Sequence, residues 1–178
     1  QVNLLEMIAS VERSKVSGEI YAPPSKSYTH RAIIISALGS GGLIKRPLIS
    51  DDTRATISAV ENFGANIDQN QDLKVEGVSG KPQTPEDVID VENSGTTLRL
   101  MSAVAALTDG AVFTGDTSIR RRPNGPLLKA LKDLGAQAFS VKKNDCAPLV
   151  ILGRLLGGNT RLDGSISSQF LSALLIAC

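Results

Sequence analysis

Aromatic residues are scarce in this sequence: they make up 3% of its 178 residues, and it contains no tryptophan. Its core must therefore be built from leucine, isoleucine, valine and alanine, and a surface that stacks nucleic-acid bases is not expected. An excess of one charge is also lacking, because 19 basic residues balance 18 acidic ones and leave a net charge of +1. This balance gives no electrostatic footprint for nucleic acid or an anionic membrane. Any anion site must be local.

Cysteines and long apolar runs are also few. Cys146 and Cys178 have neither the spacing of a metal site nor the number needed for a disulfide framework. No apolar run reaches the roughly 18 residues that span a bilayer, and residues 1–13 lack the pattern of a signal peptide. We therefore expect no metal and no membrane contact, and a reducing, cytoplasmic location. The hydrophobic share of 42% is typical of a globular domain.

The sequence does contain an internal repeat. A motif at residues 25–27 leads into an apolar run at 32–38, a strand at 43–45 and a helix at about 52–63. A second motif at 93–96 leads in the same order to an apolar run at 98–107, a strand at 111–114 and a helix at about 125–134. Both later helices stop at a glycine followed by alanine. Helices that alternate with strands predict an α/β fold.

A third opening at residues 165–169 is followed by an apolar helix at 170–177, where the sequence ends. By analogy with the earlier copies, a turn, a strand and a second helix should follow. We therefore interpret the chain as two repeats and the start of a third, a fragment of a longer protein. Further strands are expected at residues 66–69, 73–75, 137–141, 149–152 and 160–162. Each helix after an opening is apolar nearly all round, which predicts burial.

The first opening has the features of an anion site. Prolines precede the helix, Ser25 or Ser27 can cap it, and Lys26 lies beside its N-terminus, where N–H groups are unpaired. Ser27 and Arg31 share one helix face. A phosphate or carboxylate would find a hydroxyl, an ammonium and a guanidinium together. The alternative is an ordinary capped helix with solvated cations, and the local pattern alone favours neither.

The other openings are weaker signals taken singly. Gly95 permits close approach of a ligand to the backbone, and Thr96 is expected to cap its helix, as Asp51 or Asp52 is expected to cap the helix at about 52–63. The motif at 167–169 offers two hydroxyls and a carboxamide. The alternative for each is a simple turn into a helix.

Three adjacent arginines at residues 120–122 cannot all point one way, so at most one or two reach a common site, and a solvated basic loop is the alternative. Repetition favours a site: three polar helix openings have cations near them, namely Lys26, Arg31, Arg99 and Arg122. His30, the only histidine, is interpreted as a surface or hydrogen-bonded residue rather than a catalytic base.

Together these motifs resemble a known family. Ser25-Lys26-Ser27-Tyr28-Thr29-His30-Arg31, Asn93-Ser94-Gly95-Thr96, Arg122-Pro123 and Ser167-Ser168-Gln169 are similar, in order and spacing, to the motifs of 5-enolpyruvylshikimate-3-phosphate synthases. The resemblance covers almost the whole chain. It implies the enolpyruvyl transferase fold, an inside-out α/β barrel of repeated βαβαββ units in two domains, which is incomplete here. It also implies that residues 1–22 belong to the other domain and that residues 23–178 form a partial domain.

The implied activity is that of an enolpyruvyl (carboxyvinyl) transferase of the shikimate pathway, which leads to chorismate and aromatic amino acids. The 5-hydroxyl of shikimate 3-phosphate adds to phosphoenolpyruvate, and phosphate then leaves. The resemblance implies no metal or organic cofactor, no nucleic-acid or membrane partner, and a monomeric full enzyme.

By motif, Lys26 is implied to touch both substrates and to be catalytic. Ser27 and Arg31 are implied to bind shikimate 3-phosphate, and Ser167 and Ser168 to hold its phosphate.

For phosphoenolpyruvate, Gly95 and Arg122 are implied to line the site, while Asn93 and Thr96 shape the loop. Gln169 is implied to reach both ligands. The family's carboxylate base and several basic ligands are expected from the half that this sequence lacks, so we predict no turnover by this chain alone.

Two departures and two rivals bear on this interpretation. Pro24 and Ser94 stand where many members have glycine and alanine, and Ser94 adjoins the phosphoenolpyruvate loop. The sister UDP-N-acetylglucosamine enolpyruvyl transferases share the fold, but they carry Gly-Ala-Lys-Asn in the first motif and a reactive cysteine before their Arg-Pro, and residues 115–122 contain no cysteine. A non-catalytic module that binds phosphorylated metabolites is the rival of another class.

Overall fold

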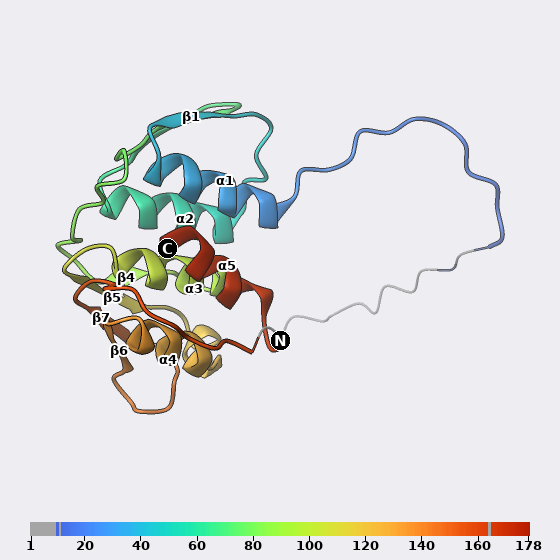
Figure 1. Cartoon of the computed structure of the whole chain (residues 1–178). Coiled ribbons are helices and arrows are strands. Elements are labelled where there is room, and N and C mark those ends of the chain that lie inside the picture. Colours follow the sequence, from blue (N-terminus) through green and yellow to red (C-terminus); the bar gives the residue numbers. More distant parts are fainter. Residues whose placement is uncertain (1–9, 11, 164) are drawn as a thin grey trace, which may run out of the picture.

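The computed structural model describes residues 10, 12–163 and 165–178 (Figure 1). Its first unit consists of α1 (Lys26–Leu38), β1 (Gly41–Ile44), α2 (Asp51–Asn62), β2 (Asn66–Gln69) and β3 (Leu73–Glu76). The strands form an antiparallel sheet in the order β1-β3-β2. The predicted helices and strands of this unit are confirmed, with bounds that differ by one or two residues except at α1, which begins at its polar opening.

The second unit consists of β4 (Ile89–Asp90), α3 (Gly95–Ala105), β5 (Gly110–Thr114), the 3-10 turn η1 (Ile119–Arg121), α4 (Gly125–Asp133), β6 (Gln137–Ser140) and β7 (Leu149–Leu152). Its sheet has the order β4-β5-β7-β6, in which only the β4–β5 pair is parallel. The order β5-β7-β6 repeats β1-β3-β2, so the predicted repeat is confirmed by topology. The second unit is a complete βαβαββ unit, α5 (Ser168–Ala177) follows it, and the described residues form two open sheets rather than a closed barrel.

The strand predicted at residues 160–162 is wrong, because these residues have no regular structure. A strand needs a neighbour that pairs its N–H and C=O groups. The equivalent strand of the second unit, β4, pairs with β5, which follows α3. Among the described residues, no strand lies beside residues 160–162 to pair with them. Conversely, the two-residue strand β4 was not predicted, since so short a segment has no periodicity to detect.

Two predicted helix caps are also wrong. Ser50, rather than Asp51 or Asp52, is the N-cap of α2, and its N–H donates to Thr53 Oγ1 at 2.8 Å. The two aspartates lie in the first turn instead, where carboxylates stabilise the positive end of the helix. Ser94, rather than Thr96, caps α3, because its hydroxyl accepts the Thr97 N–H at 3.2 Å. The cap of α1 is Ser25, one of the two serines predicted.

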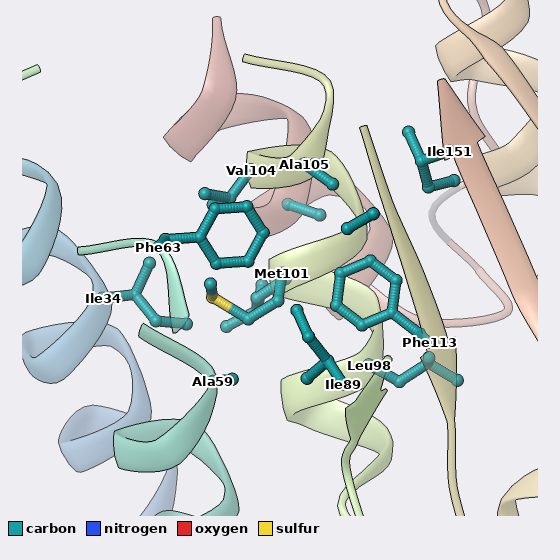
Figure 2. Packing of buried hydrophobic residues seen from close by; sticks show 14 of the residues in the cluster. Ile34, Ala59, Phe63, Ile89, Leu98, Met101, Val104, Ala105, Phe113 and Ile151 are labelled. Atoms are coloured by element: carbon teal, nitrogen blue, oxygen red, sulfur yellow. The ribbon is translucent and has the colours of Figure 1, made fainter. Parts of the chain in front are cut away.

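The core is centred on α3, whose Leu98, Leu100, Met101 and Val104 are all buried. Figure 2 shows Met101 between Phe63, from the end of α2, and Phe113 of β5. Each buried side chain of this size contributes roughly 1.5–3 kcal/mol to folding. The prediction of all-round burial is therefore right for α3.

The same prediction is wrong for α1, whose Ile35 is 58% exposed, and for α5. This helix packs on α3 through one face, but Leu175 on the opposite side is 74% exposed. Figure 1 shows α5 beside α3. Helix α5 therefore has apolar side chains that the other described residues do not cover.

The N-terminal residues 10 and 12–24 have no regular structure and lead away from the folded body (Figure 1). Their side chains are exposed, including Val16, Ile20 and Tyr21. The segment that the resemblance assigns to another domain, residues 1–22, is described only in part, because residues 1–9 and 11 lie outside the described residues. That assignment stays a prediction. No helix among the described residues is long and apolar enough to cross a membrane.

Candidate active site

Four helices begin at one pocket of about 440 Å³. Its walls include the first residues of α1, Lys26 and Ser27, and Asp52 from the first turn of α2. The start of α3 contributes Gly95 and Thr96, and Gln169 comes from the first turn of α5. Helix N-termini carry unpaired N–H groups and a partial positive charge. The arrangement is therefore suited to anions.

Lys26 and Asp52 form an ion pair across the α1–α2 contact at this pocket. The lysine side chain is half exposed, so the pair contributes little to stability. Its effect is local: the carboxylate holds the ammonium group at the pocket wall and neutralises part of its charge. Both residues line the pocket, so the ion pair holds Lys26 at its wall.

Arg122 approaches the pocket beside Gly95. Its Nη2 donates to Ser118 Oγ at 2.9 Å. A Cβ atom added to Gly95 would lie 3.1 Å from Arg122 Nη1, which is tighter than an ordinary contact. Glycine at this position therefore leaves room for the guanidinium group. The neighbouring Arg120 donates instead to Thr114 Oγ1 at 3.3 Å and does not line the pocket, in agreement with the prediction that adjacent arginines diverge.

Arg99 and Gln169 join α3 to α5. Arg99 Nη1 donates to Gln169 Oε1 at 2.6 Å, and Gln169 Nε2 donates to Thr96 Oγ1 at 2.8 Å. Arg99 Nε donates to Asn124 Oδ1 at 3.2 Å, and the guanidinium carbon lies 4.9 Å from the centre of the Phe170 ring. Burial, with the nearby Arg122 charge, lowers the pKa of Arg99. An incoming anion would relieve this repulsion between two cations.

The structure brings most of the predicted site residues together. Seven of the ten line the pocket: Lys26, Ser27, Asn93, Gly95, Thr96, Arg122 and Gln169.

The other three lie nearby without lining it. Arg31 donates to the Ser27 carbonyl at 3.0 Å and to Ser172 Oγ at 2.9 Å, and so joins α1 to α5. Ser167 caps α5 through the Gln169 N–H at 3.2 Å, and its hydroxyl lies 3.5 Å from Arg99 Nη1. Ser168 is exposed at the first position of α5.

Four lining residues were not predicted as site residues: Asp52, Arg99, Asp116 and Ser118. Arg99 was noted as a cation near the second opening, and it follows that motif as Arg31 follows the first, so the repeat was a usable signal. Asp52 was interpreted only as a cap. Asp116 and Ser118 carry no sequence signal, since their position depends on how the loop after β5 folds.

Within residues 10, 12–163 and 165–178, no group of three or more histidine, cysteine, aspartate or glutamate side chains could hold a metal ion. Cys146 is buried and Cys178 is exposed.

Comparison with known families decides where this pocket belongs. The family described as EPSP synthase (3-phosphoshikimate 1-carboxyvinyltransferase) matches residues 11–178. The chain belongs to the EPSP synthase family. The resemblance inferred from the motifs is thereby confirmed, and all seven predicted residues that line the pocket fall within the matched range.

Relatives in the EPSP synthase family are similar along nearly the whole chain. Proteins named 3-phosphoshikimate 1-carboxyvinyltransferase from Methanothrix thermoacetophila and Methanococcoides burtonii are 71% and 59% identical over 97% of this chain. An EPSP synthase structure from Acinetobacter baumannii has a TM-score of 0.82 at 28% identity, and the match covers 90% of this chain and 37% of that one. The predicted fold class is confirmed. The chain spans 41% of the length of each of these two curated relatives.

Proposed function

We propose that this chain supplies one side of the active site of an enzyme that transfers the enolpyruvyl group of phosphoenolpyruvate to the 5-hydroxyl of shikimate 3-phosphate, with release of phosphate. The observation that carries the proposal is the convergence of four helix N-termini and three cations on one pocket. Both substrates carry a phosphate and a carboxylate. Family membership and the printed names of the relatives support this chemistry.

The charge of the pocket suits two anionic substrates. Lys26, Arg99 and Arg122 outnumber the carboxylates Asp52 and Asp116, and Asp52 is already paired with Lys26. Groups already in place, such as the Arg99 guanidinium held by Gln169, need little reorganisation when charge moves from one ligand to the other. Preorganised cations and amides are the main source of transition-state stabilisation in such sites.

On the phosphoenolpyruvate side, we assign Arg122 and the amides at the start of α3 to the anionic groups. Gly95 and Thr96 begin that helix, and Gly95 permits the approach of both Arg122 and a ligand. Asn93, at the wall just before the cap, shapes this loop.

On the shikimate 3-phosphate side, we assign Ser27 and Arg31 of α1 with Ser167 and Ser168 at the start of α5. Arg31 joins α1 to α5 through Ser172, and a phosphate would replace this neutral acceptor by a charged one. Lys26 and Gln169 lie between the two groups of residues and are assigned to both ligands, with Lys26 as the catalytic cation.

The reaction requires more than this chain provides. Addition of the hydroxyl to phosphoenolpyruvate removes a proton from oxygen and adds one to the methylene carbon, which becomes a methyl group. Loss of phosphate together with a proton from this methyl group then restores the double bond. We assign the base for these transfers to the part of the protein beyond the 41% matched here. The chain alone is expected to give no turnover. We further propose that the whole protein is a cytoplasmic monomer that needs no cofactor and binds no nucleic acid or membrane.

The experiment joins this chain to the remaining sequence of the Methanothrix relative, which is 71% identical to it. Phosphate release is measured with phosphoenolpyruvate and shikimate 3-phosphate, and separately with UDP-N-acetylglucosamine as acceptor. We expect turnover only with shikimate 3-phosphate and only in the fused protein. Activity with the UDP-sugar alone would support the sister enzyme, and binding without turnover in the fused protein would support a binding module.

A matched pair of variants tests the pocket itself. Arg122→Ala should raise KM for phosphoenolpyruvate by roughly ten-fold or more, the value of one lost charge-assisted hydrogen bond. Arg120→Ala removes an equal charge two residues away, whose guanidinium contacts Thr114 instead, and should change KM little. Equal effects of both variants would contradict the assignment, since they would reflect overall charge rather than position.

A further inference from the structure

Four buried polar side chains next to the pocket are linked to one another by hydrogen bonds. His30 Nδ1 lies 2.6 Å from Thr56 Oγ1, which lies 2.6 Å from Thr97 Oγ1. Thr97 Oγ1 in turn lies 2.7 Å from Ser94 Oγ. All four residues are at most 1% exposed. They come from α1, α2, α3 and the cap of α3, and the three helices lie side by side (Figure 1).

The three hydrogen bonds that link these four side chains can all form with one consistent assignment of donors and acceptors. Burial lowers the pKa of His30 to about 4, so the imidazole is neutral near pH 7. With Nδ1 as acceptor, Thr56 donates to His30, Thr97 donates to Thr56, and Ser94 donates to Thr97. Ser94 Oγ remains free to accept the Thr97 N–H at 3.2 Å. Such buried, fully connected polar networks hold their members in one arrangement.

The network also has a cost. His30 Nε2 is buried and has no hydrogen-bond partner among the described residues. A buried unpaired polar atom destabilises a protein, and a phenyl or aliphatic side chain would avoid it. The presence of a buried histidine here is therefore better explained by the hydrogen bond that its Nδ1 accepts than by a gain in stability.

Each member of this network is close to a pocket residue, either along the chain or through a contact. Ser94 lies between Asn93 and Gly95, and Thr97 follows Thr96. Oγ1 of Thr56 and Oγ1 of Thr97 both lie 3.4 Å from the carbonyl oxygen of Asp52, whose carboxylate pairs with Lys26. His30 is one turn after Lys26 on α1. The network is thus connected to the backbone of α1, α2 and α3 near the residues by which these helices line the pocket.

We propose that His30, Thr56, Thr97 and Ser94 are positioning residues that fix the first turns of α1, α2 and α3 relative to one another. They touch neither substrate. They set the separation between Lys26, Asp52 and the amides at the start of α3, and hence the fit of the ligand held there. This inference rests on the proposed function, because it assigns these residues a part in the same reaction.

The test uses the fused protein and removes single hydroxyls without changing side-chain shape. Thr97→Val breaks the centre of the network, and Thr97→Ser restores its hydroxyl. The matched control is Ser102→Ala, on the same helix: Ser102 is equally buried, and its hydroxyl donates to the Leu98 carbonyl at 2.6 Å, outside the network. Unfolding by urea and kcat and KM for each substrate are measured for every variant.

We expect Thr97→Val to lower kcat/KM for phosphoenolpyruvate about ten-fold or more, since small misplacements of reacting groups cost up to a hundred-fold. Thr97→Ser should recover to within about three-fold of wild type. Ser102→Ala should lose stability but keep its kcat/KM. If Thr97→Val fails to fold, Thr56→Val carries the same test from α2, with Thr56→Ser as its rescue.

A second readout does not depend on turnover. Nitrogen NMR of His30, measured on this chain, in which it is the single histidine, should show one neutral tautomer with the proton on Nε2, and Thr56→Val should remove this preference. A His30 ring protonated at Nδ1, or a Thr97→Val variant as active as Ser102→Ala, would overturn the positioning role alone. A wild-type fusion without turnover would overturn the proposed function, and the positioning role with it.

Discussion

Arg99 provides the strictest test of how the pocket is held together. The substitution Arg99→Ala removes the bonds to Gln169 at 2.6 Å and Asn124 at 3.2 Å, and the contact with the Phe170 ring at 4.9 Å. Hydrogen bonds to a charged group contribute about 1.5–3 kcal/mol each, and a partly desolvated cation–π contact about 1 kcal/mol. Relief of the cost of burying the cation offsets part of this sum.

We therefore expect Arg99→Ala to lower the free energy of unfolding by about 3 kcal/mol. Asn124 adds to the loss, because it is fully buried and its Oδ1 would be left without this donor. The effect should be concentrated at α5, which Arg99 and Gln169 join to α3. Amide hydrogen exchange in α5 should accelerate more than exchange in α2.

The assay is urea unfolding followed by circular dichroism, combined with hydrogen exchange. Arg121→Ala is the control, since Arg121 is an exposed arginine of the loop before α4, and such a surface change alters stability by no more than about 0.5 kcal/mol. A loss below about 1 kcal/mol for Arg99→Ala, or equal exchange in α2 and α5, would refute the reasoning.

Three further predictions concern the same fold. Gly95→Ala should raise KM for phosphoenolpyruvate about ten-fold in the fused protein, because the new Cβ would displace Arg122 Nη1 from 3.1 Å, while the melting temperature changes little. The free energy of unfolding should fall by up to about 3 kcal/mol as pH drops from 6.5 to about 4, because His30 binds a proton in this range in the unfolded state before it does so in the folded state. Urea titrations at several pH values should show that this dependence of stability on pH is weaker in His30→Asn. Gly77→Ala should lower the free energy of unfolding by about 3 kcal/mol in the same urea assay, because its Cβ would lie 2.2 Å from the Gly39 carbonyl oxygen, whereas Gly80→Ala meets no atom within 4 Å and should cost less.

The secondary structure of the first unit could be predicted because its signals are local. Helix α2 has an apolar stripe through Ile57 and Val60, and a glycine follows its end. Strand β3 alternates buried Leu73 and Val75 with exposed neighbours. The strand expected at 160–162 failed because pairing depends on a neighbour, which no local pattern specifies.

The residues of the candidate site likewise differ in whether a local sequence signal reveals them. Residues in the helix openings, such as Ser27, Gly95 and Gln169, were found because small and polar residues before an apolar helix are a local signal. Asp116 and Ser118 were missed because their place in the pocket follows from the path of the loop after β5. The hydroxyls of Thr56 and Thr97 were missed as well, since a threonine inside a helix has the same pattern whether it faces a buried partner or solvent.

By itself, the sequence determined the repeat, the openings of the three helices and the family, because each of these is written in neighbouring residues and their spacing. Tertiary structure alone decided that Lys26 meets Asp52, that Arg99 meets Gln169, and that His30 is joined to Ser94 through two threonines. These pairs lie far apart in the chain. Their distances are set by sheet pairing and by the packing of helices around α3, which depend on residues from the whole core.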